Sequence, residues 1–124
     1  MKPKYPLTEA ELKIMQFLWD KSPMTMMELT RALEPETHWS KYTVITLLKR
    51  MAQKNMITVC EESAVKTYAP AVRKRDVARE QTDELLSHMY AGKASLLMSN
   101  LVEGGRMTES DIREIMEVLE KAQR

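Results

Sequence analysis

The residues best suited to chemistry lie between Thr37 and Cys60, a segment of 24 residues with four basic side chains and no Asp or Glu. Both signs of charge are dense elsewhere in the chain, so this acid-free window is distinctive. Its apolar residues recur at helical spacing, which predicts one buried stripe made of Val44, Leu47, Leu48 and Met51. A helix with such a stripe and a basic, polar outer face has what a DNA major groove requires. An ordinary solvated helix would be expected to mix Glu with Lys.

The outer face of this predicted helix divides into two kinds of DNA contact. Residues in the first turns of a recognition helix reach base edges, and here these are Tyr42, Thr43, Ile45 and Thr46. Phosphate contacts set the register on the duplex and carry the salt dependence of binding. The side chains predicted to make them are Ser40, Lys41, Lys49, Arg50, Lys54 and, from a later segment, Lys66.

The flanking segments contain the elements that would position this helix. Thr8 and Glu11 have the spacing of a capping box, which predicts a first helix with its apolar stripe at Leu12, Met15 and Trp19, widened by Ile14 and Leu18. A second helix is predicted over about 26–33, ending at Glu34-Pro35. A turn over residues 37–40 then leads to Ser40 as the N-cap of the basic helix.

The segment after the basic helix predicts a small hairpin. Residues 57–60 favour β-structure, as do Val65, Thr67 and Tyr68, and the polar stretch 61–64 between them suits a hairpin tip ended by Pro70. A helix-turn-helix followed by a hairpin is a winged helix-turn-helix, so residues 1–71 are predicted to form a DNA-binding domain of this type.

The rest of the chain, residues 72–124, is predicted to form three amphipathic helices, over about 72–90, over 93–102 and from the cap at Thr108 onward. About 50 residues bury little core alone, so we expect this region to be a dimerisation domain. Its predicted interface consists of Leu85, Leu86, Met89, Leu96, Leu97, Leu101, Ile112, Ile115 and Leu119. The predicted fold is mainly α with a small β-wing: a winged helix-turn-helix domain followed by a three-helix C-terminal dimerisation domain.

Charge and composition narrow the remaining possibilities. Residues 1–70 hold ten bases and eight acids, whereas residues 71–124 hold nine bases and ten acids, so the basic excess accompanies the predicted recognition helix. No apolar run approaches the roughly 20 residues that span a bilayer. Cys60 is the single cysteine, which excludes an intramolecular disulfide and a cysteine-based zinc site. We expect a cytoplasmic protein without membrane insertion, cofactor or enzymatic activity, since no nucleophile elbow, paired metal motif or phosphate loop is present.

Three motifs spread along the chain carry a family resemblance. Residues 7–19 are similar to the pattern L-T-x-x-E-x-x-I-M-x-x-L-W, and residues 39–51 to W-S-x-x-T-V-x-T-x-L-x-R-L. Residues 68–70 match Y-x-P. In these motifs the chain resembles the penicillinase-repressor family, which includes repressors of β-lactamase, methicillin-resistance and copper-transport operons. The resemblance implies a homodimeric repressor that binds an inverted-repeat DNA operator and blocks its own operon.

The chain departs from the family pattern at two places on the expected DNA face. Ile45 stands where relatives often have a base, and an apolar side chain there would suit a thymine methyl group. Glu61 and Glu62 stand at the wing tip, where relatives often have bases, and their charge would repel phosphate. Both departures bear on the operator sequence rather than on the mode of binding.

The resemblance leaves the inducing signal open. In the antibiotic-responsive branch, a membrane receptor with a zinc-protease domain triggers cleavage after an Asn in the dimer domain, typically before Phe. Asn100-Leu101 aligns with that site, with Leu in place of Phe, so it is either a regulated cleavage site or an ordinary part of the dimer core. A metal-responsive repressor is a further alternative: copper-responsive relatives carry Cys-x-Cys pairs that are absent here, although Met24, Met26 and Met27 are soft donors.

A different class of function also fits a winged helix. In a protein-interaction module the third helix contacts another protein instead of DNA. The acid-free window argues against this reading, and binding to random DNA at low salt distinguishes the two.

Overall fold

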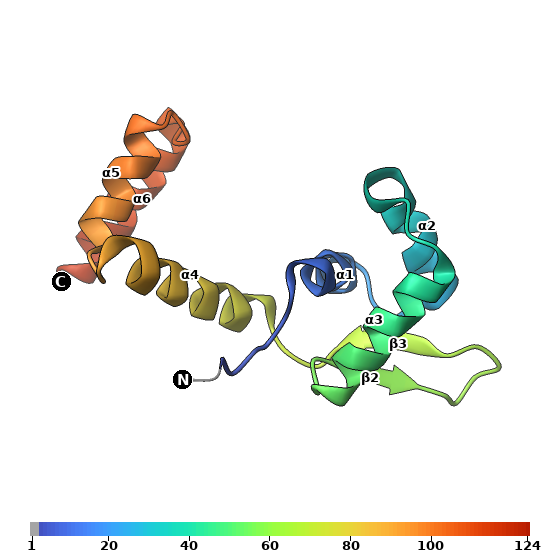
Figure 1. The fold of residues 1–124 in the computed structure, drawn as a ribbon. Helices are drawn as coiled ribbons and strands as arrows, with labels where there is room; N and C mark the ends of the chain where they lie inside the picture. Colours follow the sequence, from blue (N-terminus) through green and yellow to red (C-terminus); the bar gives the residue numbers. More distant parts are fainter. Residues whose placement is uncertain (1–2) are drawn as a thin grey trace. The chain divides into compact units, whose positions relative to one another are not determined.

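The computed structural model describes residues 3–124 (Figure 1). The chain forms two compact units, the first ending at Glu80 and the second beginning at Gln81. The elements in chain order are α1 (Glu9–Asp20), β1 (Met24–Thr25), α2 (Met26–Thr37), α3 (Lys41–Gln53), β2 (Ile57–Cys60), β3 (Thr67–Pro70), α4 (Lys74–Tyr90), α5 (Ala94–Glu103) and α6 (Glu109–Ala122).

Helix α1 begins as its sequence predicts. The Thr8 side chain accepts a hydrogen bond from the Glu11 N–H at 3.2 Å, and the Glu11 carboxylate accepts one from the Thr8 N–H at 2.8 Å, which together form a capping box. The buried face of α1 is centred on Met15 and on the two residues predicted to widen the stripe. The fully buried apolar residues are Ile14, Met15 and Leu18, whereas Leu12 and Trp19 are only half-buried.

Helix α2 runs further than predicted. The expected stop at Glu34-Pro35 is wrong, because α2 continues through Pro35 to Thr37. Proline lacks an N–H, yet the ladder resumes beyond it, since the His38 N–H donates to the Glu34 carbonyl at 3.0 Å. His38 then ends the helix in the left-handed conformation at φ 55°. The turn to α3 is therefore shorter than the predicted 37–40.

Helix α3 confirms the predicted two-faced helix. All four members of the stripe Val44, Leu47, Leu48 and Met51 are buried. The predicted N-cap is also correct, because the Ser40 side chain accepts a hydrogen bond from the Thr43 N–H at 3.3 Å.

The wing is part of a three-stranded sheet with the order β1-β3-β2. Strands β2 and β3 pair antiparallel, with Val59 opposite Tyr68, as the hairpin prediction requires. Strand β1 was not predicted: Met24 pairs with Tyr68, so two residues directly before α2 tie the helix-turn-helix to the wing. Val65 lies in the exposed hairpin loop rather than in a strand.

The first unit surrounds one apolar core built from α1, α2, α3 and the sheet. Its members are Ile14, Met15, Leu18, Met24, Leu29, Leu33, Val44, Leu47, Leu48, Met51, Met56, Ile57 and Tyr68. The start of α4 also belongs to this unit, which ends at Glu80. Val77 is buried, and the Glu80 carboxylate accepts backbone N–H bonds from Lys4 at 2.7 Å and Tyr5 at 2.9 Å.

The second unit contains the end of α4 together with α5 and α6. Helix α6 has a capping box between Thr108 and Asp111. Within residues 81–124, all of which the structure describes, no side chain is buried. None of the helices in residues 3–124 combines the length and apolar character that crossing a membrane requires.

Candidate nucleic-acid interface

The outward face of α3 presents most of the side chains predicted to touch base edges. Tyr42, Thr43 and Thr46 are exposed, and Tyr42 reaches 70% exposure. The Lys41 ammonium lies 5.4 Å from the centre of the Tyr42 ring, a cation–π arrangement that places a positive charge beside this aromatic side chain. Ile45 differs from the other three, because it is half-buried and packs against the core.

Two of the hydroxyls on this face have restricted roles. The Thr46 hydroxyl donates to the Tyr42 carbonyl at 2.9 Å, so it can offer a DNA base an acceptor but not its proton. The Ser40 hydroxyl serves as the N-cap of α3 and lies 3.5 Å from the Thr43 hydroxyl. Both groups are therefore fixed in orientation before any ligand arrives.

The N-terminus of α3 is free of acidic side chains. The first turns of α1, α2 and α6 all carry Glu or Asp, which offset the positive end of the helix dipole. The first turn of α3 carries none, and Lys41 adds a positive charge there. Unpaired backbone N–H groups and the helix dipole make such an end suitable for an anion such as phosphate.

Of the basic side chains predicted to bind phosphate, Lys41, Lys49 and Arg50 are exposed on α3. Lys54 differs from these three, because it is half-buried and already paired with an acid. Its ammonium donates to Glu11 Oε1 at 2.5 Å, and Glu11 is fully buried. Lys54 therefore joins the end of α3 to α1.

Glu11 contributes to this region in a way that its sequence position did not indicate. Burial raises the pKa of its carboxyl, but hydrogen bonds from the Lys54 ammonium and from Thr8 lower it more, so the pKa lies below its ordinary value of 4.5. Glu11 Oε2 has no hydrogen-bond partner among residues 3–124 and lies 3.8 Å from Arg50 Nε. The sequence identified Glu11 as a capping residue, but nothing in it linked this side chain to a lysine 43 positions away.

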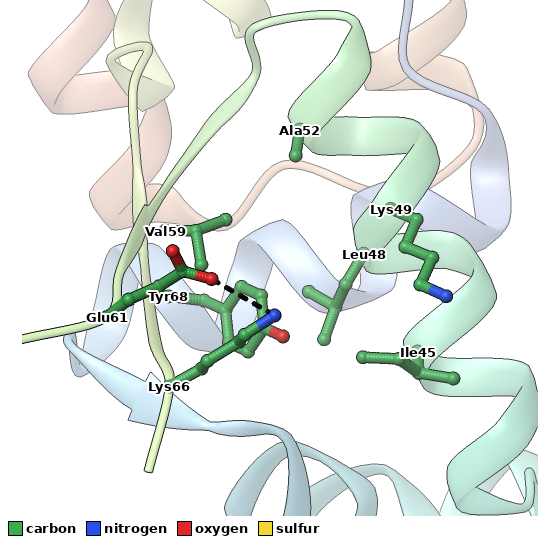
Figure 2. A pocket seen from close by; sticks show the side chains of 8 residues that line it. All are labelled: Ile45, Leu48, Lys49, Ala52, Val59, Glu61, Lys66 and Tyr68. Carbon is green, nitrogen blue, oxygen red and sulfur yellow. Dashed lines mark ion pairs between the residues drawn. The ribbon is translucent and has the colours of Figure 1, made fainter. Parts of the chain in front are cut away.

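The wing contributes Lys66, which is already engaged. Its ammonium lies 3.1 Å from Glu61 Oε1, and both side chains are exposed. Figure 2 shows this pair at a cavity of about 230 Å³ between α3 and the wing. The cavity is lined by Ile45, Leu48, Lys49, Ala52, Val59, Glu61, Lys66 and Tyr68.

The residues predicted for the dimer interface lie in or next to the second unit's three helices. Leu85, Met89, Leu96, Ile112 and Leu119 are exposed in the single chain. Leu86, Leu97, Leu101 and Ile115 are half-buried. Asn100 of the predicted cleavage site lies inside α5, and its side-chain amide donates to the Tyr90 hydroxyl at 2.8 Å.

Comparison with known proteins assigns the chain to a family. The family model described as penicillinase repressor matches residues 7–121, which is nearly the whole chain. The chain belongs to the penicillinase repressor family. This family consists of transcriptional repressors rather than enzymes, and the winged helix-turn-helix of the first unit is the fold expected of it.

Two curated members of the penicillinase repressor family show how far the similarity extends. The penicillinase repressor of Bacillus licheniformis is 26% identical over 115 residues, covering 93% of this chain and 90% of that protein. The transcriptional regulator BlaI of Mycobacterium tuberculosis is 30% identical over 108 residues, covering 85% of this chain and 78% of that protein. Both matches run through the first unit and into the second.

A solved structure from the same family resembles the DNA-binding part. It is the solution structure of the monomeric form of Bacillus licheniformis BlaI in complex with the blaP half-operator. The match has a TM-score of 0.53 and 29% identity, and it covers 61% of this chain and 93% of that one. A winged helix of this family therefore binds a half-operator in that complex.

Proposed function

We propose that this protein is a homodimeric, sequence-specific repressor that binds an inverted-repeat operator in its own operon and releases it in response to an inducing signal. Helix α3 enters the major groove, with Tyr42, Thr43 and Thr46 toward base edges. Lys41, Lys49, Arg50 and the N-terminus of α3 contact phosphates. Ile45 contributes an apolar contact at the wing side of the helix.

The observation that carries this proposal is the outer face of α3. The helix buries its apolar stripe, carries three exposed bases and has no acid in its first turn. An acid-free, basic helix end next to a wing is what binding a polyanion requires. The family membership of the chain and the half-operator complex of a relative support the same conclusion.

Dimerisation is supported by the exposed apolar side chains of the second unit. Within residues 81–124 no side chain is buried, and Met89, Met116 and Val118 are all more than half exposed. Burying such residues against a second copy removes apolar surface from water, which stabilises the assembly at about 25 cal/mol per Å². A symmetric dimer also presents two recognition helices to the two halves of a palindromic operator.

Release of the operator follows from anything that weakens the dimer. Cleavage between Asn100 and Leu101, by a protease activated through a membrane sensor, is one such signal. Because this bond lies inside α5, that helix must unwind locally before a protease can bind the backbone in extended form. The hydrogen bond from Asn100 to Tyr90 opposes that opening.

Binding of the full chain to a random-sequence duplex, measured by fluorescence anisotropy from low to physiological salt, tests the proposal. A protein with several phosphate contacts should bind at low salt and lose affinity steeply as salt rises. The logarithm of the affinity should fall with the logarithm of the salt concentration with a slope of about −0.9 for each phosphate neutralised. Absence of binding at every salt concentration would contradict DNA recognition and favour the protein-interaction module.

A further inference from the structure

The cavity between α3 and the wing combines apolar walls with opposed charges. In Figure 2, Lys49 comes from α3 while Lys66 and Glu61 come from the wing. The remaining walls are Ile45, Leu48, Ala52, Val59 and Tyr68. Apolar walls of this kind exclude part of the surrounding water, which strengthens the interaction of any anion with the two ammonium groups.

Glu61 already forms an ion pair with one of these ammonium groups, that of Lys66. Glu61 Oε1 lies 3.1 Å from Lys66 Nζ, a distance at which the ion pair can also form a hydrogen bond. A carboxylate and a phosphodiester offer a lysine the same thing, an anionic oxygen acceptor. The carboxylate therefore occupies the place that a phosphate oxygen would take on Lys66.

We propose that this cavity binds one DNA backbone phosphate and that Glu61 competes with this phosphate for Lys66. In the free protein Glu61 neutralises Lys66, and on DNA the phosphate replaces it, held by Lys66 from the wing and Lys49 from α3. The inference rests on the proposed DNA-binding function. It identifies Glu61 as a residue that lowers affinity for every DNA sequence alike, because phosphate contacts carry no sequence information.

The occupant is identified by charge and position. Two ammonium groups and one carboxylate leave a single net positive charge at the cavity, which suits an anion. With α3 in the major groove, as proposed, the backbone phosphates that border the groove are the anions nearest to the cavity beside α3.

Glu61→Gln tests the competitor, with Glu62→Gln as a matched control. Both substitutions remove one exposed wing acid and change the net charge equally, but Glu62 has no ion pair among residues 3–124. On a random duplex, Glu61→Gln should bind about two- to fivefold more tightly than Glu62→Gln, the range set by an exposed ion pair that need not be broken.

A second variant connects the gain to Lys66. Adding Lys66→Gln to Glu61→Gln should abolish the gain, because the freed ammonium is then missing. All three positions are exposed, so thermal unfolding of the variants should match that of the parent chain. Equal gains in affinity from Glu61→Gln and Glu62→Gln would contradict the proposed phosphate site while leaving DNA binding intact. If neither the parent chain nor any variant bound DNA at low salt, the proposed function itself would fail.

Discussion

The two units of this chain differ sharply in how deeply their apolar side chains are buried. In the first, Ile14, Leu18 and Leu48 are completely inaccessible to solvent and surround one core. In the second, Met89 is 70% exposed and Val118 is 63% exposed. The first unit therefore contains the interior that a small domain needs, whereas we expect the second to acquire its interior only from a partner chain.

Under the proposed function, this difference separates two tasks along the chain. A recognition helix must keep a fixed geometry, and α3 obtains it from a buried stripe on one side and the Glu11–Lys54 contact at its end. A dimerisation unit whose stability depends on a second chain can be switched, because weakening the assembly also weakens operator binding.

The largest expected effect follows from placing a charge in the second unit. Leu119→Asp should give a monomer whose affinity for a two-half-site operator is roughly 100- to 10,000-fold lower, since the linked second contact is lost. Sedimentation equilibrium and anisotropy on the same samples measure both changes. Glu120→Ala, on the same exposed helix, is the control and should remain dimeric. A monomeric Leu119→Asp variant that bound the operator at full strength would contradict the dimer mechanism.

The two units should also differ in how a substitution lowers the free energy of unfolding. Leu48→Ala removes a fully buried side chain, and urea unfolding should show a loss of about 2–5 kcal/mol at any protein concentration. Leu119→Ala should show a loss that depends on protein concentration, because its packing partner is expected to be a second chain. Equal losses, both independent of concentration, would mean that the second unit is stable in the single chain.

Glu11 provides a smaller effect with a pH signature. Because its pKa is lower in the folded than in the unfolded chain, Glu11 stabilises the fold at neutral pH, and this contribution should be lost as pH falls below about 4.5. Glu11→Gln should cost about 2 kcal/mol at pH 7, the value of a hydrogen bond to a charged group. It should also flatten the acid limb of the stability profile. Glu9→Gln, exposed on the same helix, is the control; an unchanged acid limb in Glu11→Gln would remove Glu11 from this role.

The smallest effects distinguish the two kinds of contact on α3. Lys49→Ala should weaken binding to all sequences alike and reduce the log–log salt slope by about 1. Thr46→Ala should alter the preference among operator variants by roughly fivefold, as expected for one hydrogen-bond acceptor, without changing the salt slope. Binding to a panel of single-base operator variants measures both. The same pattern of losses from the two substitutions would invalidate the assignment of faces.

Features determined by residues close in sequence were predictable. The stripe of α3, the capping boxes of α1 and α6 and the β2–β3 hairpin all depend on residues within one or two turns or strands of each other. Family motifs added the identity of the chain, which periodicity alone cannot supply. Even local rules failed at Pro35, because a helix can continue past a proline when the following N–H groups regain partners.

Features that depend on distant partners were not predictable. Two-residue strand β1 has no periodicity of its own and is defined by pairing with Tyr68 and Thr67. In the sequence Lys54 cannot be distinguished from an exposed base, and its ion pair with Glu11 forms only in the folded chain. The ion pair of Lys66 with Glu61 depends on the path of the wing loop. The basic side chains could be counted from the sequence. Which of them remain free to bind phosphate could not be predicted from it.

The central claim is most directly tested by a footprint of the full-length protein on the DNA upstream of its own gene, at a salt concentration chosen from a binding titration. The account predicts a protected region with two-fold symmetry, its half-sites about one helical turn or more apart, and affinity that falls steeply as salt rises. An unsymmetrical footprint the size of a single half-site would contradict the dimeric repressor. No protection, together with no binding to any DNA at low salt, would contradict DNA recognition by α3.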